Sequence, residues 1–512
     1  MKRSAATWVL AGAAPLLLAG GLSQRYVNLR APEPYMDEIF HVRQAQQYCL
    51  GNFHVWDPKI TTPPGLYITS YLLSKLHSLL ASTSWAAACS TESLRAHNLL
   101  FLLGTYVVLV ILGSTLNPKM SVRGCVPQAL ALSMMPISYF FHGLYYTDPG
   151  STFWVLLSYL MSVKGWHKSS ALIGLVSVTY RQTNVIWIMF AAGAATLRLL
   201  STTGAGRKTS FHDVSFSDLR GPGAFLNLVA KFVMAATTQI GPLVFCLWPY
   251  ISVALTFVGF VYWNNGIVLG DRSNHIATLH IPQLYYFICT LFGFSIFTIE
   301  WTSALEDVGR KCRSARGCLS TVVLTAVYIL SIACTVREFT IEHPFLLADN
   351  RHYSFYIWKN VYRRHPLARY AVVPGYVFAA WSCFRRFVST PRQPALLLPL
   401  YAICTAVTLV PTPLFDFRYY IIPFLIYRVH TIPSSPASNR THAGPHSKTG
   451  QAKASKKHTV NTATKQVTEF ALACSVGELI FFLIVNVGTL YLFGEKGFTW
   501  PSEPGVIQRF MW

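Results

Sequence analysis

Charged side chains are scarce in this sequence, and acidic ones are the scarcest. Only 12% of the 512 residues are charged, whereas 52% are hydrophobic, and a soluble chain has about 25% charged residues. Apolar runs of roughly 17–25 residues, the length that spans lipid, recur along the chain. The sequence therefore predicts an all-α polytopic membrane protein.

Several familiar motifs are also missing. The 11 cysteines are scattered without a CxxC pair or zinc-like spacing, so the sequence predicts no disulfide framework and no metal site. There is no Walker loop and no GxGxxG followed by a ribose-binding acid, so a nucleotide-bound substrate has no visible site. No cofactor is expected. No long internal repeat is evident, which argues against an inverted-repeat transporter.

About thirteen apolar segments are candidate membrane-spanning helices. The first is expected to stay in place rather than be cleaved as a signal peptide. The candidates are 6–23, 96–115, 127–143, 151–165, 169–182, 184–200, 239–262, 282–300, 319–336, 368–384, 395–411, 418–429 and 470–493.

The positive charge of the chain indicates the direction of these spans. The net charge is +22, and much of the excess falls in loops such as 117–124, 310–317 and 384–392. These loops share the cytosolic side if the N-terminus is cytosolic and segment 64–82 lies in the interface without crossing. If 64–82 crossed, the same loops would face the wrong side. We therefore expect an interfacial helix at 64–82, and the positive charge needs no nucleic-acid partner.

Composition divides the chain into three parts. We expect a transmembrane core over 1–429 with a luminal loop at 24–95, and a final helix with a luminal tail over 469–512. Between them, residues 430–468 are Ser, Thr, Ala, Lys and His with almost no large apolar side chain. Such a segment cannot bury a core, which predicts a disordered, basic, cytosolic loop.

Two adjacent carboxylates, Asp37 and Glu38, follow the first span. If a helix begins near Met36, Asp37 and His41 share one face, and the helix dipole favours ionised acids in its first turn. An ionised carboxylate can take a proton from a hydroxyl, as a general base must. We predict Asp37 and Glu38 as catalytic and His41 as substrate-binding. From these residues alone, helix capping and a metal site remain alternatives, although a metal would need further ligands.

Further polar clusters fall on the same predicted side as these carboxylates. Arginine suits phosphate, and Asn, Asp and His suit sugar hydroxyls. Taken singly, each cluster could instead be structural. The alternatives to substrate binding are a turn, a loop whose charges pair with each other, and a belt of residues at the membrane interface. The predicted substrate-binding residues in these clusters are Asp148, Arg181, Gln182, Asp271, Arg272, His275, Asp349, Asn350, Arg351, His352, Tyr353 and Arg418.

At these residues the sequence resembles the endoplasmic-reticulum dolichyl-phosphate-glucose-dependent α-1,2-glucosyltransferase family. The resemblance lies in the segments 34–67, 180–187, 270–275, 343–360 and 416–423. It implies a polytopic glycosyltransferase fold of the GT-C type, in the membrane of the endoplasmic reticulum with a luminal active site. It also implies Asp37 as the catalytic base.

The reaction implied by the resemblance is inverting and metal-independent. Glucose would pass from dolichyl-phosphate glucose to the diglucosylated oligosaccharide on dolichyl diphosphate and form an α-1,2 linkage. A leaving phosphate needs positive charge, which Arg272, Arg351, Arg418 or Lys359 could supply. Two alternatives stay open: a related transferase for another sugar, and a transporter or lipid flippase in which Asp37 and Asp148 carry protons.

Overall fold

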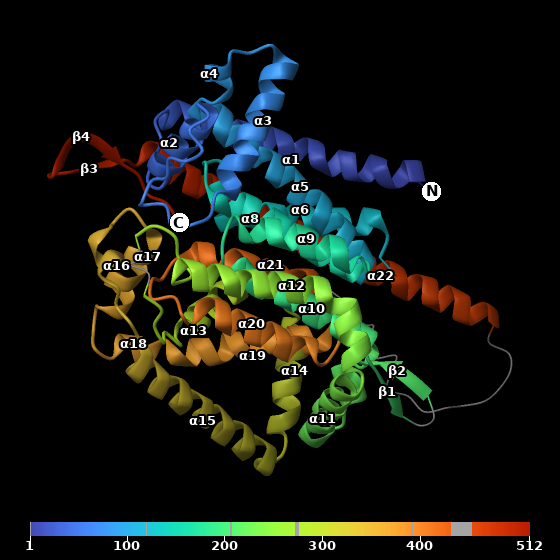
Figure 1. The fold of residues 1–512 in the computed structure, drawn as a ribbon. Helices are drawn as coiled ribbons and strands as arrows, with labels where there is room; N and C mark the ends of the chain where they lie inside the picture. The colour runs from blue at the N-terminus through green and yellow to red at the C-terminus, as the bar shows by residue number, and fades with distance from the viewer. Residues whose placement is uncertain (1, 119, 205–206, 272–275, 391–392, 432–452) are drawn as a thin grey trace.

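The protein is predominantly helical in the computed structural model, which describes residues 2–118, 120–204, 207–271, 276–390, 393–431 and 453–512 (Figure 1). Helices of the first half are α1 (Lys2–Arg30), α2 (Glu38–Cys49), α3 (Gly65–Ala81), α4 (Trp85–Ala88), α5 (Thr91–Leu116), α6 (Val122–Ser133), α7 (Pro136–His142), α8 (Thr147–Val163), α9 (His167–Val178), α10 (Asn184–Leu199), α11 (Pro222–Thr238) and α12 (Ile240–Asn264).

Helices continue through the second half, with short 3₁₀ and π turns between some of them. They are α13 (Gln283–Phe294), α14 (Trp301–Cys312), α15 (Ala315–Phe339), α16 (Pro344–Ala348), α17 (Tyr353–Ile357), α18 (Ala368–Ala371), α19 (Val373–Ser389), α20 (Leu397–Leu409), α21 (Ile421–His430) and α22 (Lys453–Glu495). The short turns are η1 (Phe211–Asp213), η2 (Phe216–Asp218), η3 (Ile296–Thr298), η4 (Trp358–Tyr362) and η5 (Phe417–Tyr420).

The strands of the described residues form two small antiparallel pairs. One pair joins β1 (Ser201–Gly204) to β2 (Arg207–Ser210). The other joins β3 (Phe498–Trp500) to β4 (Glu503–Gln508), with an irregular register at Thr499 and Trp500. In Figure 1 the two pairs lie at opposite ends of the helical bundle, and β3–β4 projects beyond it beside α2, α16 and α17.

Each of the predicted membrane-spanning segments contains a helix, but the predicted number of about thirteen spans is not confirmed. Among the described residues, five helices are long and apolar enough to cross a membrane, or six if the bent pair α6–α7 is one span. The other helices are mostly too short, because a straight span needs about 20 residues. The α6–α7 pair shows how one apolar run becomes two helices, since it bends by 73°.

Residues 432–452 of the loop predicted to be disordered, 430–468, lie outside the described residues. From Lys453 onward the chain is already the beginning of α22. Lysine, which supplies four of residues 453–468, is a good helix former, so a segment without a core can still extend a following helix.

A disulfide bond joins Cys49 to Cys89, so the prediction that the chain has no disulfide framework is wrong. The bond links the end of α2 to the residue after α4. Motif spacing could not reveal it, because the two cysteines are 40 residues apart. The compartment could have revealed it: Cys49 and Cys89 are the two cysteines of the predicted luminal loop 24–95, and disulfides persist in oxidising compartments.

A compact apolar cluster fixes α2 and α3 against the membrane helices. Its buried members come from α2, the loop after it, α3, α5 and the residues just before α8 and just after α9: Val42, Ala45, Tyr48, Ile60, Leu66, Tyr67, Leu94, Phe101, Tyr145 and Tyr180. At the start of α3, the Gly65 N–H donates to the Thr179 carbonyl at 2.9 Å. A β-carbon at Gly65 would come within 2.6 Å of that oxygen, so only glycine allows this approach. The predicted helix at 64–82 is therefore present and rigidly placed.

Candidate functional site

Asp37 lies at the N-terminus of α2, and its side chain makes no hydrogen bond to the backbone of that helix. It is the N-cap residue, yet its carboxylate makes no capping hydrogen bond. The preceding residue, Met36, has a φ of 57°, a left-handed conformation that is strained for a large side chain. Strain of this kind persists where the surroundings enforce it and is concentrated at functional sites. The turn therefore directs the Asp37 carboxylate away from the helix.

Glu38 is fully buried and both of its carboxylate oxygens are occupied. Arg95 of α5 donates to them from Nε at 2.8 Å and from Nη2 at 2.6 Å. The backbone N–H groups of Tyr35 and Tyr145 add two further hydrogen bonds, at 3.0 Å and 2.6 Å. These bonds fix the beginning of α2 to two other segments. Glu38 thus holds its neighbour Asp37 in place and has no oxygen left to accept a substrate proton.

Arg418 of η5 connects Asp37 to a second carboxylate. Its Nη1 donates to Asp37 Oδ2 at 2.9 Å, and its Nη2 lies 2.7 Å from Asp416 Oδ2. Asp416 also accepts the Arg418 backbone N–H at 2.8 Å. The guanidinium lies 5.6 Å from the ring centres of Phe141 and Tyr146. The cation is therefore held between two acids and two aromatic rings.

The charges around Asp37 decide its protonation. Burial raises the pKa of the Asp37 carboxyl, but Arg418 and His41 lower it by more, so the pKa lies below its usual range. The pKa of Asp416 is lowered in the same way, with burial opposed by Arg418. Burial lowers the pKa of His41 to about 4. At neutral pH the site therefore holds two ionised carboxylates beside a neutral imidazole.

His41 lies on α2 one turn after Asp37, as the helical spacing predicts. Its Nδ1 is 2.6 Å from the hydroxyl of Tyr67. Its ring also meets the Tyr146 ring, with centroids 6.0 Å apart. His41 is therefore close to Asp37 but is held by two tyrosines.

Asp148 and Arg181 form a second pair behind Arg418. Arg181 Nη2 lies 2.9 Å from Asp148 Oδ1, and the Asp148 side chain is 5% exposed. Arg181 also lies 5.8 Å from the ring centre of Tyr419, next to Arg418 in the chain. The pair thus adjoins the Asp37–Arg418 group from the ends of α8 and α9, as the sequence predicts for one polar face.

Asp349 and Arg351 form a third pair, before α17. Arg351 donates from Nε to Asp349 Oδ1 at 2.8 Å and from Nη2 to Oδ2 at 2.7 Å. Burial raises the pKa of Asp349, but the bond from Arg351 and the nearby His352 bring it below its usual range. His352 Nδ1 is 2.9 Å from the carbonyl of Trp512. Tyr353 packs edge-on against the Trp512 ring at 5.1 Å.

A cavity of about 380 Å³ brings two of these groups together. Asp37, Asp416 and Arg418 line it together with Asp349, Arg351 and His352. The side chain of Asp37 is 46% exposed, and that surface faces the cavity. Trp500 and Trp512 also line it, with mostly apolar residues around them: Met36, Phe345, Leu346, Ala348, Ser354, Leu414 and Phe415. The arrangement offers three ionised carboxylates, of which Asp37 is the most exposed, together with two arginines and aromatic surfaces, to a single ligand.

Other predicted site residues lie elsewhere. Gln182 supports a loop, because its Nε2 donates to the Thr61 carbonyl at 2.8 Å. Asp271 pairs with Lys59 at 3.5 Å, away from the cavity lining. Arg272 and His275 lie outside the described residues. Asn350 accepts a hydrogen bond from Trp500 Nε1 at 2.8 Å and so supports the lining indirectly.

Sequence reasoning missed Arg95, Asp416, Trp500 and Trp512, as well as the mostly apolar remainder of the cavity lining. Asp416 carried a usable signal, because it precedes Arg418 with the same Asp-x-Arg spacing as Asp349 and Arg351. Arg95 lies at the beginning of an apolar span, where a charged residue is a functional candidate by default. The two tryptophans carried no local signal.

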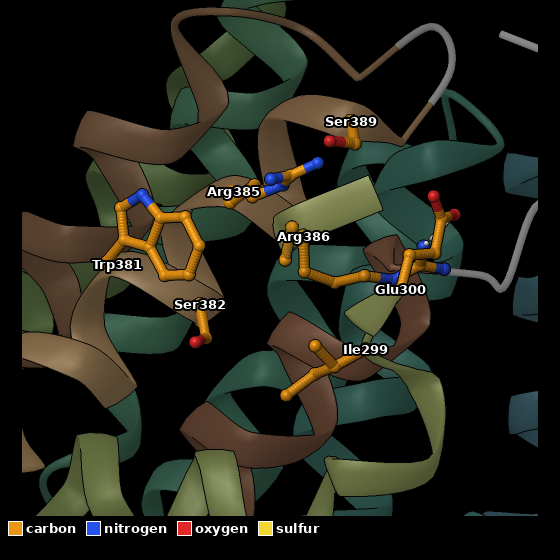
Figure 2. A pocket seen from close by; sticks show the side chains of 8 residues that line it. Ile299, Glu300, Trp381, Ser382, Arg385, Arg386 and Ser389 are labelled. Atoms are coloured by element: carbon orange, nitrogen blue, oxygen red, sulfur yellow. Dashed lines mark hydrogen bonds and ion pairs between the residues drawn. The ribbon is translucent and has the colours of Figure 1, made fainter. Parts of the chain in front are cut away.

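A second pocket is shown in Figure 2, between α19 and the segment before α14. The figure shows Glu300 and Arg386 side by side; Arg386 Nη1 lies 3.0 Å from Glu300 Oε1. The space measures only about 10 Å³, enough for roughly one water molecule. It is therefore too small for a sugar or phosphate, and the cavity beside Asp37 is the candidate site.

The fold and the site define a class: a helical membrane protein with an acid–arginine cavity at one end of its bundle. The sequence profile of the DIE2/ALG10 family matches residues 31–429. The chain belongs to this family.

Relatives are similar over almost the whole chain. The Dol-P-Glc:Glc(2)Man(9)GlcNAc(2)-PP-Dol alpha-1,2-glucosyltransferase of Homo sapiens is 37% identical over 489 residues, which cover 94% of this chain and 93% of the human protein. The protein of the same name from Arabidopsis thaliana is 33% identical, covering 95% of this chain and 96% of its own length. Among solved structures, the Archaeoglobus fulgidus oligosaccharyltransferase aligns with a TM-score of 0.39 and 13% identity, covering 90% of this chain and 55% of that one.

Proposed function

We propose that this protein transfers glucose from dolichyl-phosphate glucose to the terminal glucose of the diglucosylated lipid-linked oligosaccharide, forming an α-1,2 linkage. Family membership and the names of relatives with 33–37% identity support the reaction. The observation that carries the site assignment is the ionised Asp37 carboxylate, exposed to the cavity and bonded to Arg418 at 2.9 Å.

Asp37 acts as the general base in this proposal. Its carboxylate takes the proton of the acceptor hydroxyl while that oxygen attacks the anomeric carbon of glucose. The bond between the anomeric carbon and the phosphate oxygen breaks, and dolichyl phosphate leaves as an anion. Attack opposite a β-linked phosphate gives the α product. Holding both substrates in one cavity supplies the orientation.

Arg418 is proposed to meet the phosphate. It lines the cavity, and Asp416 and Asp37 partly balance its charge. An anion that approaches Arg418 competes with Asp37 for the same Nη1. Such competition would weaken the Arg418–Asp37 bond and make Asp37 more basic when the donor is bound.

The architecture is proposed to be of the GT-C type, with more spans than the five or six that length and composition identify in the described residues. The core is 1–429, with loop 24–95 and the tail after residue 495 in the lumen of the endoplasmic reticulum. The disulfide between Cys49 and Cys89 supports this placement, because it belongs to an oxidising compartment.

A reconstituted assay tests the function. Purified protein is given dolichyl-phosphate glucose or dolichyl-phosphate mannose, with acceptors carrying one or two glucoses. We expect one hexose to be added only from the glucose donor to the diglucosylated acceptor, in a 1,2 linkage by methylation analysis. Equal use of the mannose donor would favour a related transferase. Movement of lipid across sealed vesicles without a new glycosidic bond would favour a flippase.

A further inference from the structure

Residues 496–512, here called the strap, follow α22 and return across the candidate site. The family profile ends at residue 429, so the match assigns nothing to the strap. The strap contains the β3–β4 hairpin and two tryptophans that line the cavity, Trp500 and Trp512. In Figure 1 the end of the chain lies beside α2 and α17. Asp37, just before α2, and Ser354 of α17 both line the cavity.

The strap is attached at several points, so its position is defined. The Met511 N–H donates to the Arg351 carbonyl at 2.9 Å, and the Tyr353 N–H donates to the Met511 carbonyl at 3.0 Å. Arg509 Nη1 donates to the carbonyls of Phe493 and Gly494 at 2.9 and 3.1 Å. These bonds tie the strap to both the α17 region and the end of α22.

Trp500 is oriented by two polar neighbours. Its Nε1 donates to Asn350 Oδ1 at 2.8 Å, and the Arg351 guanidinium lies 4.6 Å from its ring centre. The hydrogen bond fixes the ring plane, and the cation packs on the ring. Trp500 is half-buried and lines the same cavity as Asp37. A rigid aromatic ring thus stands in the same cavity as the candidate base.

We infer that Trp500 is the platform on which a terminal hexose of the acceptor oligosaccharide packs. The inference rests on the proposed glucosyl transfer and adds the residue that receives the acceptor. The C–H groups of a hexose face pack on an aromatic ring, while its hydroxyls reach neighbouring polar groups. Asn350 and Arg351 supply such groups beside Trp500, and the Asp37 carboxylate faces the same cavity.

The position of Trp500 favours the acceptor over the donor. The donor glucose is tied to a lipid phosphate, whereas the acceptor presents a large hydrophilic glycan from the aqueous side. Most of β4, the partner of β3, is exposed, and the hairpin projects beyond the helices (Figure 1). Trp512 is different, because its ring packs among Phe294, Phe417 and Tyr353.

The test compares Trp500→Ala and Trp500→Phe in the full chain. With dolichyl-phosphate glucose and the diglucosylated acceptor, Trp500→Ala should raise the acceptor KM about tenfold and leave the donor KM within about twofold. Trp500→Phe should recover most of the loss, because it keeps a ring. The matched control is Trp8→Ala, since Arg123 lies over the Trp8 ring at 4.3 Å in the same kind of contact.

A binding measurement separates failure of this inference from failure of the proposed function. The lipid-free diglucosylated glycan is titrated against the protein by saturation-transfer NMR. A glycan signal that is lost in Trp500→Ala and kept in Trp8→Ala supports the platform, whether or not glucose is transferred. Absence of glucose transfer counts against the proposed reaction and not against the platform. An unchanged acceptor KM, equal rises in both KM values, or an undiminished glycan signal in Trp500→Ala would overturn the inference.

Discussion

Two Asp-x-Arg turns, one at Asp349–Arg351 and one at Asp416–Arg418, have the same local structure and different surroundings. In each, the backbone N–H of the arginine donates to Oδ1 of the aspartate, at 3.0 Å and 2.8 Å. In each, the guanidinium pairs with the same carboxylate at 2.7 Å. Two residues of spacing are enough to build this turn, and both copies line the cavity.

The difference lies in the third partner of the arginine. Arg418 reaches a second carboxylate, Asp37, whereas Arg351 reaches the neutral Gln508 of the strap at 3.1 Å. The first turn therefore sets the charge of the candidate base, and the second holds a binding surface. The same Asp-x-Arg motif therefore has a different role in each place, because a different segment of the chain packs against it.

The largest effect on turnover is expected from Asp37→Asn, which removes the group that distinguishes the two turns. Loss of a general base costs about 10²–10⁴-fold in kcat. Asp213→Asn, an exposed acid of η1, is the matched control and should leave kcat unchanged. Kinetics are measured on protein with a normal melting temperature. Turnover of Asp37→Asn near the wild-type value would remove Asp37 from the mechanism and make Asp416 the next acid to test.

The next largest effect is expected from Arg418→Gln. Loss of one positive group that stabilises developing charge costs about 10²–10³-fold. The pKa of Asp37 is lowered by Arg418, so activity should persist to acidic pH in the wild type. Without the arginine the Asp37 pKa rises, and the acidic limb of kcat/KM against pH should move to higher pH.

Arg351→Gln is the control for this shift, because Arg351 pairs with Asp349 and does not contact Asp37. Its acidic limb should stay at the wild-type pH. An acidic limb that moves equally in both variants would mean that the two turns do not differ in the way the geometry indicates.

The sequence predicts the local parts of this comparison well. The acids at 37 and 38, the Asp349–Arg351 pair and Arg418 are all visible as clusters of polar residues in an apolar chain. In the structure, every predicted span contains a helix. The pairing of Arg418 with Asp37 is not local, because 381 residues separate them. Only the fold of the whole chain brings η5, which packs against α7 and α21, to the residue before α2.

Long-range contacts also explain what was missed. Glu38 resembles Asp37 in sequence, but its role follows from Arg95, 57 residues away in α5. Trp500 meets Asn350 across 150 residues. Composition also could not give the number of spans, because apolar runs predict where helices form and not where they bend. The break between α6 and α7 falls just before Pro136, the first residue of α7, and a proline disfavours helical backbone in the residue before it.

A smaller effect on turnover is expected from Glu38→Gln, which sharpens the contrast between the adjacent acids. It leaves Arg95 buried without its charge partner, and breaking a buried pair costs about 3–5 kcal/mol of unfolding free energy. Displacement of Asp37 should lower kcat by about ten- to a hundredfold. The pH of the acidic limb should not move, and Glu92→Gln, exposed on the same helix as Arg95, is the control. A normal melting temperature with kcat as low as that of Asp37→Asn would instead make Glu38 a catalytic group.

The smallest effect is expected from Arg351→Lys, which keeps the charge of the second turn and removes its planar fork. Lysine cannot make both bonds to Asp349. Because the side chains of the pair are 20% exposed, the unfolding free energy should fall by about 1 kcal/mol or less. The acceptor KM should rise up to about fivefold, because Arg351 also packs on Trp500, while kcat stays near the wild-type value. Arg123→Lys, which changes the equivalent contact with Trp8, should alter neither constant. A fall in kcat of a hundredfold in Arg351→Lys would show that the second turn, like the first, acts on the reacting atoms.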